Sequence, residues 1–215
     1  MIEAVLIVTA YLVGSLSPSV MLGRLVRGVD VRRHGSGNAG ATNAFRVLGV
    51  RLGIVVLLLD VVKGFVPVAV AGLFVDPTAI VLVGMAAMAG HNWSLFLRGR
   101  GGKGVATGAG VLLAVMPLTL AVLVLLFVVM LLSTSLVSLS SLTAAVGLPV
   151  LAMLAGQPYP YQVFSLVAAA VVVYAHRANI RRLLRREEPR SGLSWVSVGG
   201  WFRSRKGGHE EKGGA

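Results

Sequence analysis

The sequence predicts an all-α membrane protein with seven transmembrane helices, and three observations indicate this class. First, 56% of the 215 residues are hydrophobic and 13% are charged, whereas a soluble domain has about 25% charged residues. Second, the mean hydropathy is +0.83, and long apolar blocks recur along most of the chain. Third, the cations gather in clusters between these blocks. We therefore expect repeated membrane spans rather than a soluble domain with an apolar core.

The first residues and the lack of cysteine exclude several features. Met1 leads directly into an apolar run, with no basic segment before it and no convincing cleavage site. We interpret this run as a retained helix and not as a signal peptide. The chain has no cysteine, which excludes disulfides, thiolate metal sites and a cysteine nucleophile.

The distribution of positive charge predicts which loops lie on the cytoplasmic side of the membrane. A net charge of +12 is compatible with nucleic-acid binding, but the cations lie in three clusters, over residues 24–51, 98–103 and 177–212, with Lys63 alone. The positive-inside rule assigns these clusters to the cytoplasmic side, where anionic lipid headgroups are their natural partner. A nucleic-acid partner is therefore not expected.

The span count follows from length and parity. Residues 105–132 form an apolar block of 28 residues, longer than the roughly 20 that one helix needs. Both ends of the region from Lys103 to Arg177 are cytoplasmic, so it must cross an even number of times. Splitting the block at Pro117, which cannot continue a helix, restores parity. The N-terminus is then outside and the C-terminus cytoplasmic. The predicted spans are roughly residues 4–22, 52–73, 79–97, 105–116, 117–132, 139–155 and 161–175.

This topology brings four polar segments to the cytoplasmic side. They are the opening loop (residues 32–46), the Lys103 loop (residues 98–104), a serine-rich stretch (residues 133–141) and the end of the last span at His176. We predict one membrane domain over residues 1–190 and a flexible, basic, glycine-rich cytoplasmic tail over residues 191–215.

Both loops formally contain G-x-G-x-x-G, at residues 35–40 and 99–104. Neither lies between a strand and a helix, so they do not indicate a dinucleotide site. The Lys103 loop is not a Walker A motif either, because Gly104 stands where Ser or Thr is needed. Glycines still allow backbone N–H groups to converge on an anion. Two such loops on one side favour a phosphate site, although flexible loops that only touch headgroups would look similar.

Two further pairs of polar residues have functional and structural interpretations. His176 and Asn179 are three apart and share a helix face, although a lone interfacial histidine is often structural. Asp60 and Lys63, also three apart, lie within a predicted span. Isolated charges there would cost about 2.5–3.5 kcal/mol each. We therefore interpret them as a structural intramembrane pair, with a proton relay as the alternative.

Five segments together resemble one family. They are His34–Asn43 with Arg46, Asp60–Gly64, Gly90–His91, Gly101–Thr107 and His176–Ile180. They stand in the order found in the bacterial acyl-phosphate-dependent glycerol-3-phosphate acyltransferases, integral membrane enzymes of phospholipid synthesis. Five co-linear matches are much more specific than one motif.

The resemblance implies a multi-pass protein of the bacterial cell membrane with its active site facing the cytoplasm. It also implies transfer of a fatty acyl group from acyl-phosphate to the sn-1 hydroxyl of glycerol 3-phosphate, which forms lysophosphatidic acid and phosphate. The two substrates and membrane lipids are the expected partners. No cofactor, metal, acyl-CoA or acyl carrier protein is expected.

Carried over position by position, the family's catalytic residues fall on Ser36, Arg46, Lys103, His176 and Asn179. We expect substrate- and phosphate-binding groups at Gly37, Asn38, Gly40, Thr42, Asn43, Gly102, Gly104, Ser138 and Ser141. Acyl-phosphate is already activated, so we expect direct attack by the glycerol hydroxyl, assisted mainly by positioning and electrostatics. The proton acceptor is either a substrate phosphate or His176.

Two other classes of function remain. A small lipid or anion transporter would use Asp60 and Lys63 as its intramembrane pair, but inverted repeats with matched broken helices are absent by inspection. A noncatalytic headgroup-binding scaffold would not need the four polar segments to converge.

Overall fold

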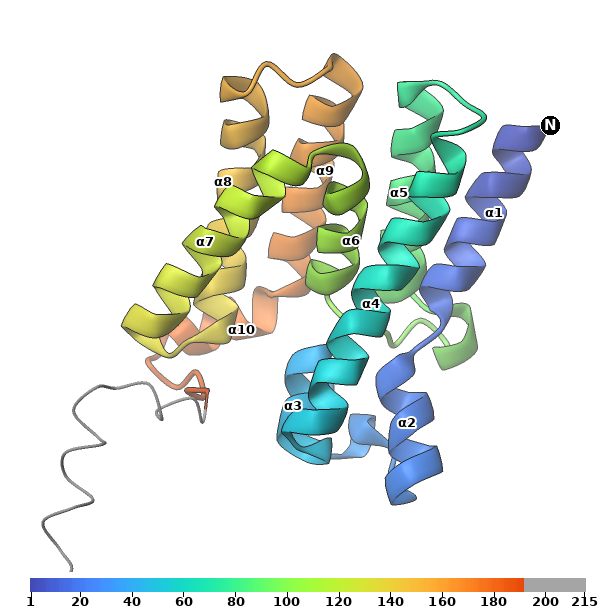
Figure 1. The fold of residues 1–215 in the computed structure, drawn as a ribbon. Helices are drawn as coiled ribbons and strands as arrows, with labels where there is room; N and C mark the ends of the chain where they lie inside the picture. Colours follow the sequence, from blue (N-terminus) through green and yellow to red (C-terminus); the bar gives the residue numbers. More distant parts are fainter. Residues whose placement is uncertain (192–215) are drawn as a thin grey trace, which may run out of the picture.

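The computed structural model describes residues 1–191, and these residues form an all-helical fold (Figure 1). The predicted tail, residues 191–215, lies outside the described residues apart from Ser191. The elements are α1 (Ile2–Ser15), α2 (Pro18–Arg27), the 3-10 turn η1 (Val31–Arg33), α3 (Ala41–Leu48), α4 (Val50–Ala71), α5 (Pro77–Asn92), the 3-10 turn η2 (Leu95–Leu97), α6 (Val105–Val115), α7 (Pro117–Thr134), α8 (Val137–Leu154), α9 (Tyr159–Ala175) and α10 (Arg177–Leu184).

The predicted class, a helical membrane protein, is confirmed. The structure supports five or six membrane spans, whereas the sequence predicted seven. Within residues 1–191, five helical segments are long and apolar enough to cross a membrane. A sixth results if α9 and α10, bent by 61°, form one span. Helix α6 has 11 residues, which corresponds to about 16 Å of axis, or about half of the hydrocarbon core.

The predicted break at Pro117 is present. Helix α6 ends at Val115, Met116 leaves the helical conformation with φ −142°, and α7 begins at Pro117. Proline suits this first position because its missing N–H has no helical partner there. The long apolar block is therefore two helices, as parity required.

The first predicted span, residues 4–22, lies within a candidate span over Ile2–Arg27, but the helix is interrupted inside it. Residues 4–22 do not form a continuous helix, because α1 ends at Ser15 and α2 starts at Pro18. Leu16 and Ser17 are extended, with ψ values of 132° and 95°. Pro18 causes this break, since a proline disfavours the helical conformation of the residue before it. The third predicted span, 79–97, agrees with a candidate span over Pro77–Leu97, in which α5 ends at Asn92 and η2 follows.

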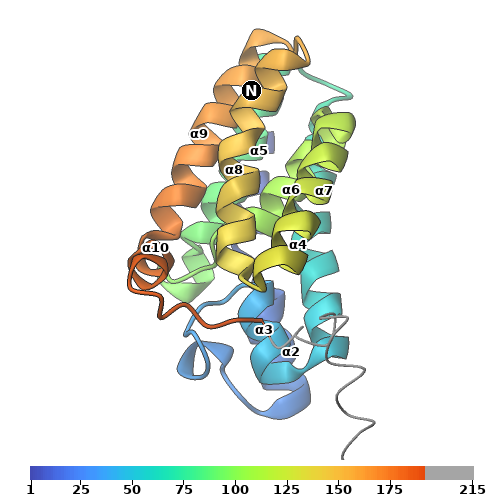
Figure 2. The ribbon, with the colours of Figure 1, turned by 90° about the vertical axis from the view of Figure 1, so that its left-hand side faces the viewer.

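The irregular segments and short helices gather at one end of the molecule. Figure 1 shows α2, α3 and α10 at the lower end, and the N-terminus with the α4–α5 and α8–α9 turns at the upper end. The segment after α10 crosses the lower end to the α7–α8 turn (Figure 2), where the Ser191 N–H donates to the Ser135 carbonyl over 2.7 Å. The serine-rich stretch is mostly helical rather than a loop, since α7 continues to Thr134 and α8 starts at Val137.

Close helix crossings hold the bundle together. Lipid tails are as apolar as leucine, so association in a membrane depends on packing, and small residues let backbones approach closely. A Cβ atom on Gly64 of α4 would collide with the Thr107 carbonyl of α6, and one on Gly110 of α6 would collide with the Val61 carbonyl of α4. Gly14 of α1 lies equally close to α5.

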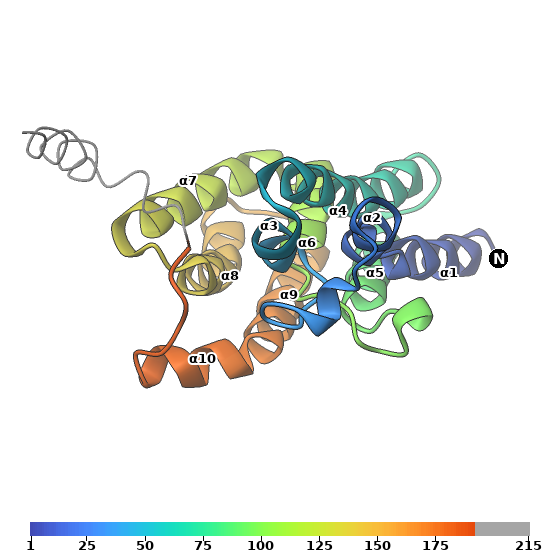
Figure 3. The same ribbon diagram turned by 90° about the horizontal axis from the view of Figure 1, so that it is seen from below.

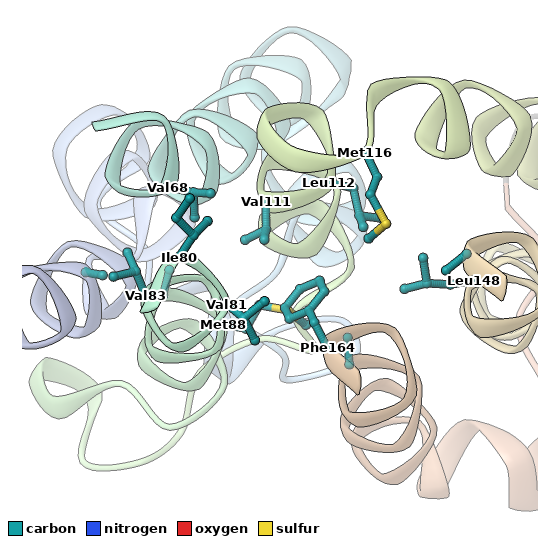
Figure 4. Packing of buried hydrophobic residues seen from close by; sticks show 14 of the residues in the cluster. Val68, Ile80, Val81, Val83, Met88, Val111, Leu112, Met116, Leu148 and Phe164 are labelled. Atoms are coloured by element: carbon teal, nitrogen blue, oxygen red, sulfur yellow. The ribbon is translucent and has the colours of Figure 1, made fainter. Parts of the chain in front are cut away.

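By contrast, α7 buries only Thr119 and Leu123 among the described residues. Figure 4 shows Leu112 and Met116 of the α6–α7 region together with Leu148 of α8 and Phe164 of α9, which belong to the same hydrophobic cluster. Leu112, Leu148 and Phe164 also line the cavity described below.

Candidate active site

A cavity of about 420 Å³ extends from the lower end of the molecule into the apolar space beside α7. The lining residues mostly belong to the opening loop, the Lys103 loop and helices α3 to α10, and Figure 3 shows these helices from below. The apolar lining includes Leu112, Leu120, Leu123, Phe127, Ala145, Leu148, Phe164, Ala168 and Val172. The polar lining includes Ser36, Asn38, Gly40, Thr42, Asn43, Arg46, Asp60, His91, Lys103, Gly104, Ser138, Ser141, His176, Asn179 and Glu188.

The structure brings all five predicted catalytic residues to this one cavity. Two predicted binding residues are not brought to it, because neither Gly37 nor Gly102 is part of the lining. Gly37 instead allows a turn with φ +71°, and a Cβ atom on Gly102 would collide with the His91 imidazole. The two glycines shape the loops behind the cavity, and their predicted role in binding substrate phosphate stays a prediction.

The opening loop is folded around the side chain of Asn43, which is 1% exposed. Its Nδ2 group contacts the carbonyls of Val31, His34 and Asn38 at 2.8, 3.1 and 2.9 Å. Its Oδ1 atom accepts from the Ser36 N–H at 2.8 Å. The amide of Asn43 is thus engaged within the loop, and it determines where Ser36 lies.

Asp30 holds the beginning of the same loop. Its carboxylate accepts from the Arg32 side chain at 2.7 and 3.0 Å and from Arg24 at 2.9 Å. The hydrogen bond from Arg32 keeps the pKa of Asp30 well below its usual range. Arg46, in contrast, makes no ion pair within residues 1–191 and is exposed at the cavity. Its guanidinium group is available to an anion.

A polar network from the last helices holds Lys103. The Lys103 Nζ group donates to Asn179 Oδ1 at 2.5 Å, and Asn179 Nδ2 donates to Glu188 Oε1 at 2.6 Å. Burial lowers the pKa of Lys103 to about 8, although the Glu188 carboxylate opposes this shift. Lys103 is therefore a partly desolvated cation at the polar end of the cavity.

Glu188 is a site residue that sequence reasoning missed. It follows α10 at the predicted boundary of the membrane domain, and its side chain is 5% exposed. Burial opposes ionisation of Glu188, but hydrogen bonds from Asn179 and Arg182 outweigh it and lower its pKa. The available signal was an acidic pair within a strongly basic segment, but the sequence does not show which of the two glutamates turns inward.

Replacing Glu188 with glutamine is expected to lower the kcat/KM of the purified protein about tenfold. A hydrogen bond to a charged group contributes about 1.5–3 kcal/mol, and this one orients Asn179 and thereby Lys103. Steady-state kinetics of the purified protein check this value. Glu187→Gln is the matched control, because its exposed side chain makes no hydrogen bond in the described structure. Equal kcat/KM in the two variants would remove Glu188 from the site.

The imidazole of His176 is 3% exposed, and its Nδ1 atom lies 2.8 Å from the Val172 carbonyl. A carbonyl only accepts, so this contact requires the proton on Nδ1. Nε2 is left as the ring atom that is free to accept a proton. The geometry is thus compatible with both roles considered for His176, as an orienting group and as a base.

The two predicted serines differ in their engagement. Ser141 Oγ donates to the Val137 carbonyl at 2.9 Å. Ser138 Oγ is buried and lines the cavity. It lies beside the Glu188 carboxylate and contributes to lowering the pKa of that group. Ser138 therefore belongs to the polar end of the cavity together with Glu188.

The intramembrane pair is present. Lys63 Nζ lies 2.8 Å from Asp60 Oδ1, and both side chains are buried. His91 Nδ1 lies 3.5 Å from the same oxygen, so the pair is extended to a group of three. Only Asp60 and His91 of this group line the cavity.

The fold and the cavity define a class of protein. This is a helical membrane protein whose cavity joins a cationic, polar end suited to phosphate with an apolar arm suited to a hydrocarbon chain. Such a lining suits a ligand that combines a phosphate group with a hydrocarbon chain.

Comparison with known proteins gives the family. The model of the glycerol-3-phosphate acyltransferase family matches residues 4–186. A glycerol-3-phosphate acyltransferase of Bacillus velezensis is 43% identical over 195 residues, covering 91% of this chain and 100% of that protein. That of Bacillus subtilis is 40% identical over 196 residues, with the same coverage. The chain belongs to the glycerol-3-phosphate acyltransferase family.

Solved structures support this assignment. The glycerol 3-phosphate form of PlsY, an integral membrane glycerol 3-phosphate acyltransferase, has a TM-score of 0.87 and 36% identity, covering 92% of this chain and 100% of that chain. Its lysophosphatidic acid form has a TM-score of 0.84 and covers 89% and 96%. The family resemblance and the integral membrane fold expected from the sequence are confirmed.

Proposed function

We propose that the protein transfers a fatty acyl group from acyl-phosphate to the sn-1 hydroxyl of glycerol 3-phosphate, forming lysophosphatidic acid and inorganic phosphate. The observation that carries this proposal is the two-part lining of the cavity. Its polar end presents Arg46 and Lys103 to phosphate, and its arm of leucine, phenylalanine and alanine side chains accepts an acyl chain. Both acyl-phosphate and the product combine these two chemistries.

The proposal includes the topology: seven crossings of the bacterial cytoplasmic membrane, with the N-terminus outside and the site facing the cytoplasm. The positive-inside rule supports it, since α2, which carries Arg24, and α10, which begins at Arg177, lie at the lower end of the molecule. The chain has no native cysteine, so single introduced cysteines are labelled uniquely. Arg100→Cys should react only after the membrane is opened, and Thr78→Cys in intact cells. The reverse pattern would contradict the orientation.

The chemistry requires positioning more than activation. In our proposal, the glycerol hydroxyl attacks the acyl carbonyl carbon, the carbonyl–phosphate C–O bond breaks, and the departing phosphate takes the proton. Arg46, Lys103 and loop N–H groups hold the phosphates, and Ser36 donates to the developing oxyanion. His176 and Asn179 orient glycerol 3-phosphate, and Ser138 and Thr42 supply further contacts. No covalent enzyme intermediate or cofactor is needed, because acyl-phosphate is already activated.

His176→Gln distinguishes the two candidate proton acceptors. If a substrate phosphate accepts the proton, the variant retains substantial activity and the wild-type pH dependence, because glutamine can still orient the substrate. If Nε2 of His176 is the base, the acidic limb of the pH–rate profile disappears with most of the rate. Profiles of kcat and kcat/KM for both proteins decide between these mechanisms.

Activity should also decline on the alkaline side. The pKa of Lys103 is lowered to about 8, so its ammonium group is present below that pH and is lost above it. Because the kcat/KM profile reports groups of the free enzyme, kcat/KM should fall as the pH rises past about 8. Lys103→Arg should move this fall to higher pH, since arginine stays charged. An alkaline limb unchanged in Lys103→Arg would contradict the assignment.

The central experiment incubates the purified protein with palmitoyl-phosphate and labelled glycerol 3-phosphate. The expected result is labelled lysophosphatidic acid, with none formed from palmitoyl-CoA. Product from palmitoyl-CoA alone would replace the proposed donor. No product from either donor would remove the catalytic interpretation and leave the transporter alternative, which uptake of glycerol 3-phosphate into proteoliposomes tests directly.

A further inference from the structure

A chain of contacts runs through the membrane interior from the break in the first span to the Lys103 loop. It starts at Leu16, whose carbonyl lies at the end of α1, where the helix stops and cannot supply a partner. Lys63 Nζ donates to this carbonyl at 2.7 Å. Lys63 thus satisfies a backbone group that the break leaves without a helical partner, in a region where water does not compete.

The series of contacts continues from Lys63 of α4 through Asp60 to His91 of α5. Lys63 Nζ is 2.8 Å from Asp60 Oδ1, and the same oxygen is 3.5 Å from His91 Nδ1. All three side chains are at most 7% exposed. The His91 ring therefore lies beside the Asp60–Lys63 ion pair, and Lys63 of that pair contacts the break between α1 and α2.

His91 in turn contacts the Lys103 loop directly. The Gly102 N–H donates to the His91 carbonyl at 2.9 Å, and the Gly101 N–H donates to the Asn92 carbonyl at 3.2 Å. The Gly102 Cα packs so closely on the imidazole that a Cβ atom would collide with it. The residue after Gly102 is Lys103, so a shift of the ring moves the backbone that carries the ammonium group.

Packing alone does not explain why Asp60, Lys63 and His91 are ionisable residues. Three apolar side chains of similar volume would cost less free energy to bury, and replacing buried ion pairs by apolar side chains often leaves stability unchanged or higher. The ion pair of Asp60 and Lys63, however, holds its two members at a defined separation of 2.8 Å. Within residues 1–191 no hydrogen bond or ion pair joins Asp60, Lys63 or His91 to the Lys103 side chain, so any influence on Lys103 passes through the loop backbone.

We propose that Asp60, Lys63 and His91 are positioning residues for acyl transfer, which fix the Lys103 loop relative to the α1–α2 break and so set the place of the Lys103 ammonium group. They contact no substrate phosphate in this proposal. It rests on the proposed function for its assay and on the contacts above for its geometry. Misplacement of a catalytic group by about 1 Å can cost about 100-fold in rate.

The decisive variant is the double substitution Asp60→Leu with Lys63→Met. It leaves no unpaired charge in the membrane, but it removes the contacts to His91 and to the Leu16 carbonyl. We expect thermal unfolding in detergent at or above the wild-type temperature, with kcat reduced roughly 10- to 100-fold and KM for glycerol 3-phosphate changed much less. A double variant with wild-type stability and wild-type kcat would overturn the proposal.

Gly102→Ala tests the last contact of this series, between His91 and the Lys103 loop, without altering any charge. The added methyl group displaces the His91 ring or the loop, so kcat should fall while KM changes little. Arg100→Gln is the matched control in the same loop, since its exposed side chain does not line the cavity.

If the double variant does not reach the membrane, Gly102→Ala decides whether the proposal stands. Unchanged kcat in that variant would overturn it. Turnover of the wild-type protein in the same assay tests the proposed function separately, so the two failures are distinguishable.

Discussion

Replacing Lys103 with methionine is expected to reduce kcat by about 100- to 1,000-fold, the usual effect of removing one preorganised electrostatic group from an active site. Methionine keeps the length and the apolar stem of the side chain but removes the cation at the polar end of the cavity. In the structure this cation is partly desolvated and held by Asn179. In the proposed mechanism this cation acts on a substrate phosphate with little reorganisation.

The measurement is steady-state acyl transfer by purified protein, together with thermal unfolding in detergent. Lys103→Met should unfold near the wild-type temperature, because the substitution removes a single hydrogen bond to Asn179 within residues 1–191. Arg100→Gln, three residues earlier and exposed, should keep wild-type kinetics. A Lys103→Met protein within about tenfold of wild-type kcat would show that Lys103 does not act on the reacting phosphate.

Replacing Gly110 with alanine is expected to destabilise the protein by about 1–3 kcal/mol, the range for overpacking a closely packed interior. A Cβ atom at this position meets the Val61 carbonyl of α4, and a backbone carbonyl cannot move aside as a flexible side chain can. Helices α4 and α6 must separate, although their close approach supplies much of their packing energy in the membrane. Activity should fall as well, because α6 begins two residues after Lys103.

Gly72→Ala is the matched control. Gly72 directly follows the last residue of α4 with φ −59°, and the nearest atom to an added Cβ is 3.4 Å away. Alanine there should leave the unfolding temperature unchanged or slightly raised. If Gly110→Ala and Gly72→Ala unfold at the same temperature in detergent, the α4–α6 contact is not a determinant of stability.

Local chemistry could be predicted from the sequence because its causes lie within a few residues. Apolar block length gives a span, and Pro117 ends a helix whatever surrounds it. The cation clusters place the loops by a rule that depends on composition alone. The order of the glycine, histidine and asparagine motifs was sufficient for the family. The same local causes made the break before Pro18 predictable, since this proline acts as Pro117 does, but hydropathy alone favoured a continuous helix there.

What only the tertiary structure decided involves residues far apart in the chain. Lys103 and Asn179 are separated by 76 positions, and Lys63 and Leu16 by 47. No periodicity or spacing determines such pairs, because they depend on how whole helices cross. The inward position of Glu188 and the need for glycine at position 102 have the same origin. The sequence by itself determined the class, the family and the candidate residues of the site. The helix crossings determined which of those residues meet, since the small residues at each crossing set how closely two backbones approach in a membrane.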